Sequence, residues 1–210
     1  ICFLNIGGIS NITKIIKKDE KLEKNLEAFD SGPGNCMIDE WVRKNSKNNF
    51  DKNGLIAKSG KIDQLILNQV IDNFELNNFD KSLDIKDFDI SFARGLSLED
   101  GCATITNFTA YLIAKGIEYA NGTNIDPIKF LVCGGGRKND YLINGIKNYL
   151  SHKKNISLNS IDDYSLNGDY IESQAFGYLA IRSFLNLPIS YPKTTGCVTP
   201  TVGGKLAQNI

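Results

Sequence analysis

The stretch from 28 to 39, Ala-Phe-Asp-Ser-Gly-Pro-Gly-Asn-Cys-Met-Ile-Asp, sets one carboxylate beside residues that favour tight turns. Asp30 stands at the expected end of a strand, Gly32-Pro33-Gly34 follows, and an apolar helical pattern begins near Asn35. Such a turn can direct backbone N–H groups at an anion while the neighbouring carboxylate accepts a proton. The same residues also make an ordinary turn before a helix, so both interpretations stay open here.

Two further glycine-rich segments also follow expected strands. Gly7-Gly8 follows the apolar run from Cys2 to Ile6, and Gly134-Gly135-Gly136 separates a second apolar run from Asn139, the expected cap of another helix. Glycine lets the backbone approach a ligand closely, and a following helix adds its positive end. Together the three segments favour a nucleotide or phosphate site. None matches the G-x-x-x-x-G-K-[ST] loop or the G-x-G-x-x-G fingerprint, so the site belongs to another class.

The remaining acids and the single histidine are weaker candidates for chemistry. Asp39, four residues into the expected helix, is predicted to be a surface acid, and Glu172 has the spacing of a favourable first-turn carboxylate. His152 stands in a polar run and is expected at the surface, which disfavours histidine-based catalysis and histidine-rich metal sites. Asp100 and Asp169 complete the set of acids considered.

Composition limits the class of protein. The chain has 210 residues, 41% hydrophobic and 23% charged, which is typical of a globular chain with a core. A formal net charge of zero argues against a nucleic-acid or anionic-membrane surface, and no run is long enough to span a membrane. The five cysteines are odd in number and form no C-x-x-C, so we expect no disulfide framework or zinc site and a cytoplasmic location.

The hydrophobic patterns predict a mixed α/β domain. Three short strands form an antiparallel meander, and helices and strands then alternate, which suits helices on both faces of a sheet. Strands are expected at 2–6, 12–16, 26–29, 129–133 and 156–158, and helices from 35, around 62–70, and at 98–119, 139–150 and 170–185. The order is also typical of the ribonuclease-H-like lobe of actin, sugar kinases and heat-shock ATPases. The segment 45–91 is expected to be a helical or loop insertion.

Several segments together resemble the C-terminal part of the anhydro-N-acetylmuramic acid kinase family. The resemblance covers almost the whole chain, and the first two segments are specific in combination. The segments are LNIGGISNIT (4–13), FDSGPGNCMID (29–39), EDGCATITNFTA (99–110), LVCGGGRKNDYL (131–142), and DYIESQAFGYLAIRSFLNLP with PKTTGCVTPTVGG (169–204).

The resemblance implies an actin-like sugar kinase with two lobes that uses ATP and Mg²⁺. It implies hydrolysis of the 1,6-anhydro bridge of 1,6-anhydro-N-acetylmuramic acid with phosphorylation of O6. The product would be N-acetylmuramic acid 6-phosphate, in the recycling of peptidoglycan. It further implies a homodimer, and the zero net charge noted above argues against a nucleic-acid or membrane partner.

The resemblance also implies roles for individual residues. Asp30 corresponds to the catalytic base, and Glu172 to an active-site carboxylate for the sugar or the metal. The metal ligands are not assigned. The other implied contacts are Asn11 with the sugar, and Gly7, Gly8, Gly32, Gly34, Gly134, Gly135, Gly136 and Asn139 with the nucleotide and its phosphates.

The family's first lobe, with a Gly- and Ser-rich phosphate loop, has no counterpart in the sequence. Because an apolar strand is expected at residue 1, we interpret 1–210 as the C-terminal lobe of a longer protein and expect no turnover from it alone. Two alternatives stay open. One is another actin-like sugar kinase, which a substrate panel would separate, and the other is a non-catalytic nucleotide-binding module, which supplying the missing lobe would separate.

Overall fold

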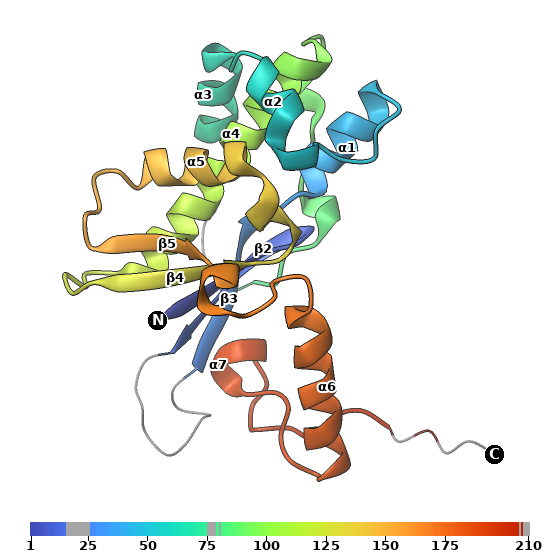
Figure 1. Ribbon diagram of the computed structural model, residues 1–210, viewed down its shortest axis with the longest axis vertical. Helices are drawn as coiled ribbons and strands as arrows, with labels where there is room; N and C mark the ends of the chain where they lie inside the picture. Colours follow the sequence, from blue (N-terminus) through green and yellow to red (C-terminus); the bar gives the residue numbers. More distant parts are fainter. Residues whose placement is uncertain (16–25, 75–78, 80, 206, 208–210) are drawn as a thin grey trace.

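The computed structural model describes residues 1–15, 26–74, 79, 81–205 and 207, and it contains a five-stranded mixed sheet (Figure 1). The strand order is β3-β2-β1-β4-β5. The β1–β2 and β2–β3 pairs are antiparallel, whereas the β1–β4 and β4–β5 pairs are parallel. The strands are β1 Cys2–Ile6, β2 Ile9–Ile15, β3 Leu26–Pro33, β4 Ile128–Cys133 and β5 Ile156–Ser160. The predicted α/β class is confirmed.

Five helices gather on one side of the sheet, as Figure 1 shows. They are α1 Cys36–Asn45, α2 Leu55–Ser59, α3 Gln64–Asn73, α4 Leu98–Asn121 and α5 Asp140–Tyr149. Short 3₁₀ turns occur at Lys52–Gly54, Ile85–Asp87, Ser91–Ala93, Gly135–Lys138 and Ile161–Tyr164. In the segment 45–91, α2 and α3 pack on α4, and the residues 75–78 and 80 lie outside the described part. That this segment is an insertion stays a prediction.

The central helix α4 joins these helices to the sheet. Its first turn is capped by Ser97, whose Oγ accepts the N–H of Asp100 at 3.0 Å. Gly101 leaves room for the indole of Trp41, and Gly116 leaves room for Ser31 of β3. Small residues thus let α1 and the sheet approach α4 closely. Among the described residues, no helix is long and apolar enough to cross a membrane.

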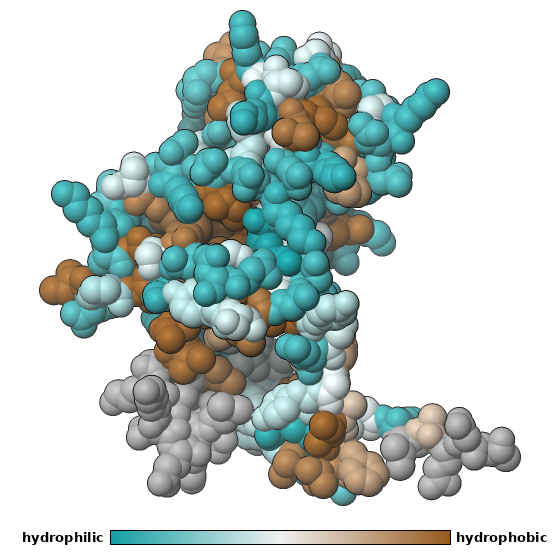
Figure 2. Space-filling view, viewed as in Figure 1, coloured by the Kyte–Doolittle hydropathy of each residue, from teal (hydrophilic) through white to brown (hydrophobic). Residues whose placement is uncertain are grey.

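The opposite side of the sheet carries α6 Ile171–Phe184 and α7 Pro192–Thr195 (Figure 1). None of the residues in α6 is buried, and the side chains of Phe176 and Phe184 are 72% and 69% exposed. Figure 2 shows apolar side chains on the surface at the end of the molecule where α6 lies. The helix α7 is joined to β3 by an ion pair between Lys193 Nζ and Glu27 Oε1 at 2.7 Å. We call the segment 165–204 the α6–α7 arm.

Two predicted boundaries are wrong. The strand β3 continues to Pro33 instead of ending at 29, so Asp30 lies inside a strand and the Gly-Pro pair is not in a turn. Proline is tolerated there because β3 lies at the edge of the sheet that the described residues form, with β2 as its neighbour. The strand β2 begins at Ile9 instead of 12, and Ile16 of its predicted range lies outside the described residues.

The spacing of Ile62, Leu65, Ile66 and Val70 predicts one apolar face, and the structure differs from it at Leu65: Ile62 and Val70 pack on the core, but Leu65 does not. Leu65 is 79% exposed, whereas Leu67 is the buried residue of the helix. The helix begins only at Gln64, where Asp63 Oδ1 accepts the N–H of Ile66 at 3.0 Å. The side of α3 that packs on the core therefore contains Leu67 and the apolar residues one turn further along the helix.

Asp39 is not the surface acid that its position in α1 predicts. Its side chain is partly buried, and burial raises its pKa to about 6 against the opposing effect of Arg43, with Asp51 adding to the rise. The folded state therefore disfavours the ionised carboxylate. The contribution of Asp39 to the free energy of unfolding is fully present below its unfolded pKa of about 3.9. It is lost as the pH rises through its folded pKa of about 6.

Asp39→Asn should therefore raise the melting temperature above pH 7 and give no gain at pH 4. Asparagine keeps the shape but carries no charge to bury. Thermal unfolding at both pH values measures the difference, with Glu40→Gln on the same helix as the control for loss of an exposed acid. An equal gain at pH 4 and pH 7.5 would exclude the burial of charge as the cause.

Gly116→Ala should destabilise the chain by about 1–3 kcal/mol, the usual cost of overpacking. A Cβ at this position would lie 2.4 Å from Ser31 Cβ, so α4 and β3 must separate. The control is Gly177→Ala in α6, where a Cβ meets nothing within 4 Å and better helix propensity should stabilise by about 0.5–1 kcal/mol. Denaturant unfolding of both variants measures this, and a stabilised Gly116→Ala would show that the close approach does not constrain the fold.

Candidate active site

A row of polar side chains crosses four strands of the sheet. Asp30 of β3 pairs with Asn11 of β2, Asn11 pairs with Asn5 of β1, and Asn5 pairs with Cys133 of β4. Direct cross-strand partners share one face of a sheet. Because the alternate residues of β1 are buried on the side of α4, this polar row faces the side of the α6–α7 arm.

A β-bulge turns β3 immediately after Asp30. Asn11 is opposite Asp30, but Ser10 is opposite Gly32, so Ser31 is the extra residue. Ser31 is buried, and its Oγ lies 3.0 Å from Ser10 Oγ. Gly32 has a φ of +139°, and a Cβ there would lie 3.1 Å from Leu112 Cβ. Bulges recur next to active sites, where they change the direction of a side chain. Here the bulge follows Asp30, which is the last residue of the polar row.

The carboxylate of Asp30 is held by one of its two oxygens. Oδ2 accepts the backbone N–H of Leu83 at 2.8 Å. Among the hydrogen bonds of the described residues, none reaches Oδ1. A carboxylate that is oriented through one oxygen can take a proton on the other.

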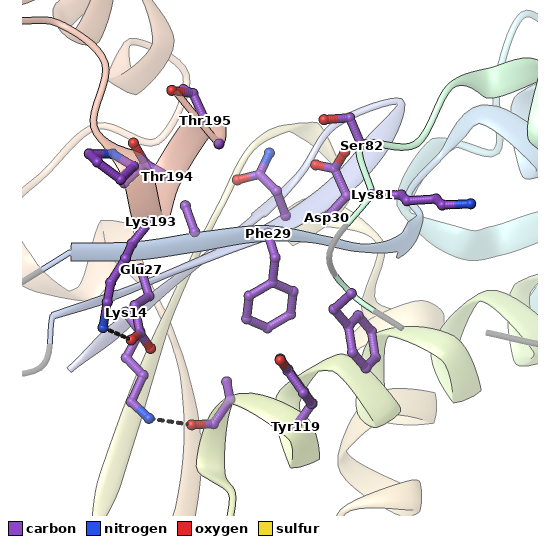
Figure 3. A pocket seen from close by; sticks show the side chains of 16 residues that line it. Lys14, Glu27, Phe29, Asp30, Lys81, Ser82, Tyr119, Lys193, Thr194 and Thr195 are labelled. Carbon is purple, nitrogen blue, oxygen red and sulfur yellow. Dashed lines mark hydrogen bonds and ion pairs between the residues drawn. The ribbon is translucent and has the colours of Figure 1, made fainter. Parts of the chain in front are cut away.

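Asp30 and Asn11 line a cavity of about 620 Å³ between β3, α7 and the end of α4. Figure 3 shows Asp30 and Ser82 on one side of β3, and Phe29 with Tyr119 on the other. The rings of Phe29 and Tyr119 meet edge to face, with centroids 5.1 Å apart. The volume lies in the range of small-molecule sites, which combine apolar walls with a few polar groups.

The first glycine pair and the Gly-Pro-Gly segment pack on each other. The N–H groups of Gly34 and Cys36 donate to the carbonyl of Gly8 at 2.9 and 3.1 Å, and that of Asn35 donates to Gly7 at 2.7 Å. A Cβ on Gly34 would lie 2.2 Å from Gly7 O, so glycine is needed for this contact. These N–H groups are therefore not directed at an anion, contrary to the expectation for this segment. Gly8 differs, since it is exposed and a Cβ there meets nothing within 4 Å.

The three glycines after β4 divide into two kinds. Gly134 has a φ of +77°, and a Cβ there would lie 2.4 Å from Asn5 Oδ1. A Cβ on Gly136 would lie 2.3 Å from Ile6 Cγ2. At Gly135, however, the nearest neighbour of a Cβ is Asn35 Nδ2 at 3.9 Å, so this position is open. Packing alone requires the first and third glycines, whereas the second has room for a ligand.

Asn139 caps α5 as predicted. Its Oδ1 accepts the N–H of Leu142 at 3.0 Å, and the residue is buried. The side-chain oxygen is thus committed to the helix, and any nucleotide contact by Asn139 would have to use other atoms.

Glu172 reaches the other end of the polar row. It stands in the first turn of α6, and Asn5 Nδ2 donates to its Oε1 at 3.5 Å. Burial, with a smaller effect of the Glu172 charge, raises the pKa of the Cys133 thiol to about 11, so this neighbour stays protonated. Two strand spacings, roughly 10 Å, separate the strands that carry Asp30 and Asn5. The structure thus groups Asp30 with Asn11, and Glu172 with Asn5 and Gly134.

Asn5 was missed by the sequence analysis because it lies within an apolar run. The signal was its place in the alternation, on the side opposite Leu4 and Ile6. Of the other acids, Asp100 accepts the N–H of Lys61 at 2.7 Å and Asp169 pairs with Arg137, both away from the cavity. His152 lies at the surface, as predicted. No three metal-ligating side chains come together in the described part of the chain.

Comparisons with known proteins identify the family of the chain. The sequence model of the family described as anhydro-N-acetylmuramic acid kinase matches residues 1–208. Proteins named anhydro-N-acetylmuramic acid kinase from Pelagibacter ubique and Zymomonas mobilis are 50% and 38% identical over 99% and 98% of this chain. One from Methylobacterium nodulans is 34% identical over 99% of it. The chain covers 55%, 54% and 53% of these relatives, so it spans about half their length.

The family match also bears out the predicted architecture. The mixed sheet with helices is the actin-like, ribonuclease-H-like fold that the resemblance implies. The chain belongs to the anhydro-N-acetylmuramic acid kinase family.

Proposed function

We propose that this chain forms the C-terminal lobe of a two-lobed kinase that acts on 1,6-anhydro-N-acetylmuramic acid. The reaction opens the 1,6-anhydro ring with water and transfers a phosphoryl group from ATP to O6, giving N-acetylmuramic acid 6-phosphate for peptidoglycan recycling. The observation that carries the proposal is the Asp30 carboxylate, oriented by Leu83 N–H at the wall of a ligand-sized cavity. The names of the relatives support the choice of sugar.

Asp30 has the geometry of a general base in this reaction. Its Oδ1 takes a proton from the water that attacks the anomeric carbon, while Leu83 N–H holds Oδ2. The C1–O6 bond breaks, and C1 keeps the hydroxyl of the water. O6 then receives the γ-phosphoryl group of ATP, whose bond to the β-phosphate oxygen breaks so that ADP leaves. Asn11, the cross-strand neighbour of Asp30, offers its amide to a sugar hydroxyl in the same cavity.

The glycine loop after β4 fits a nucleotide at one point. Gly135 leaves the space that a Cβ would fill, and Gly134 and Gly136 hold the loop against β1. ATP would supply the phosphoryl group, and Mg²⁺, when bound, would neutralise charge on its phosphates. Gly8, at the tip of the β1–β2 hairpin, has open space around it, which supports a contact with those phosphates in this proposal. Glu172 adjoins the loop through Asn5 and is an active-site carboxylate in this proposal.

The proposal includes the cytoplasm as the site of reaction and a homodimer as the assembly. The five free cysteines suit a reducing compartment. Molar mass in solution, measured by light scattering on the two-lobed protein, tests the dimer. A substrate panel separates the proposal from another actin-like sugar kinase, because only the anhydro-sugar reaction consumes one water per phosphate transferred.

Asp30→Asn in the two-lobed protein should lower turnover by about 10²–10⁴-fold, the usual loss for a general base. Asparagine can still accept the N–H of Leu83, so the fold and ATP affinity should change little. Turnover and ATP affinity are measured on the same preparation. The control is Asp100→Asn, which removes a carboxylate that also accepts one backbone N–H but lies outside the cavity. Near wild-type turnover in Asp30→Asn would remove Asp30 from the mechanism.

Gly135→Val should weaken ATP binding at least about tenfold without lowering the melting temperature. The added side chain fills space that the fold leaves open and that the nucleotide needs. Calorimetric titration with ATP measures the affinity, and thermal unfolding without ligand verifies the fold. Gly177→Val, at an equally open glycine in α6, is the matched control. Unchanged ATP affinity in folded Gly135→Val would count against a nucleotide at this loop.

A further inference from the structure

The position of α6 over the sheet does not depend on an apolar core. None of its 14 residues is buried, so burial of side chains contributes little to holding it. Yet the first turn of this helix carries Glu172 to the polar row. Polar contacts before the helix must therefore fix its starting point.

Arg137 makes those contacts from the glycine loop. Its side chain is 5% exposed, with Nε 2.7 Å from Asp162 Oδ2 and Nη1 2.9 Å from Asp169 Oδ1. Nη1 also donates to the carbonyl of Gly134 at 3.1 Å. One guanidinium thus joins the loop after β4, the turn after β5 and the residue three positions before Glu172.

The chain around Arg137 is shaped to receive it. A Cβ on Gly168 would lie 2.3 Å from Arg137 Nε, so the guanidinium packs directly on the backbone there. The N–H of Gly168 donates to Asp162 Oδ1 at 2.8 Å. Hydrogen bonds from Arg137 and then Gly168 lower the pKa of Asp162 to about 2, which keeps this carboxylate charged at neutral pH. Lys138 adds a second ion pair to Asp169 at 2.7 Å.

We propose that Arg137 is a positioning residue that fixes the start of α6, and with it the Glu172 carboxylate, against the glycine loop. The part that Glu172 plays in turnover rests on the proposed function. Arg137 acts through Asp162 and Asp169 and does not itself touch the reacting atoms. A planar guanidinium can hold two carboxylates and a carbonyl together, whereas a lysine ammonium offers a single point of charge.

A double-mutant cycle in the two-lobed enzyme tests the link between Arg137 and Glu172. Arg137→Lys should lower kcat about 10–100-fold, as a misplaced catalytic group does. Glu172→Gln should also lower kcat, and the double variant should be no more than about twofold slower than Glu172→Gln, because the two changes remove one function. Multiplied losses, or wild-type kcat in Arg137→Lys, would overturn the proposal, whereas wild-type kcat in Glu172→Gln would refute the part of Glu172 in the proposed function.

Arg182→Lys is the matched control within the α6–α7 arm. Arg182 contacts the carbonyl of Pro188 at 2.7 Å and the hydroxyl of Tyr191 at 2.8 Å, at the far end of α6. Any loss of kcat from this change should multiply with that of Glu172→Gln. If Arg182→Lys and Arg137→Lys show equal coupling to Glu172→Gln in kcat, any change that loosens the α6–α7 arm has the same effect. That result would overturn a specific role for Arg137.

Hydrogen exchange gives a second readout that needs no substrate. In Arg137→Lys, the amide hydrogens of residues 174–178 should exchange at least tenfold faster than in the wild type, while those of β1 and β4 should not change. Unchanged exchange in α6 would overturn the positioning role whatever the substrate. Arg137→Lys could exchange faster while the wild-type enzyme does not phosphorylate the anhydro sugar. That pair of results would support the positioning role of Arg137 and refute the proposed function.

Discussion

The pleat of β1, β2 and β3 makes successive side chains point to opposite faces of the sheet, and both core and site depend on this alternation. In β1, Leu4 and Ile6 are fully buried on the side of α4, so Asn5 between them must face the α6–α7 arm. Its cross-strand neighbours continue the polar row to Asp30. A shift of register by one residue would bury the row and expose the core. Packing energy therefore holds the polar row in place.

Several glycines in the glycine-rich segments are required by packing within the fold, although the sequence pattern alone indicates a ligand site. Gly34 is needed where α1 begins against the Gly7 carbonyl, and Gly134 and Gly136 are needed where the loop crosses β1. Only some glycines, such as Gly135, leave space outside the protein's own packing. Most glycines in these loops are thus required by close contacts between segments of the chain. A ligand can approach the backbone at the glycines that these contacts leave open.

Regular periodicity made much of the fold predictable. The long helix α4 and the apolar strand β4 were identified from their patterns, and the cap at Asn139 from its residue type. The extent of β3 was not, because Gly32-Pro33 is a local turn signal and only pairing with β2 makes it a strand. The contact of Asn5 with Glu172 spans 167 residues, so no local pattern could reveal it. Asp30 was singled out because the residues that mark it, Gly32-Pro33-Gly34, follow it almost directly in the sequence, whereas its contact with Leu83 spans 53 residues.

The distorted end of β3 has a consequence for the solubility of the sheet edge. An edge strand exposes backbone groups on which a strand of another molecule can pair and start aggregation. In β3, Pro33 offers no N–H group, and the extra residue Ser31 breaks the regular spacing of donors and acceptors. Lys193 from α7 adds a charge beside the same strand through its contact with Glu27. The distortion next to Asp30 thereby also makes β3 a poor template for a foreign strand.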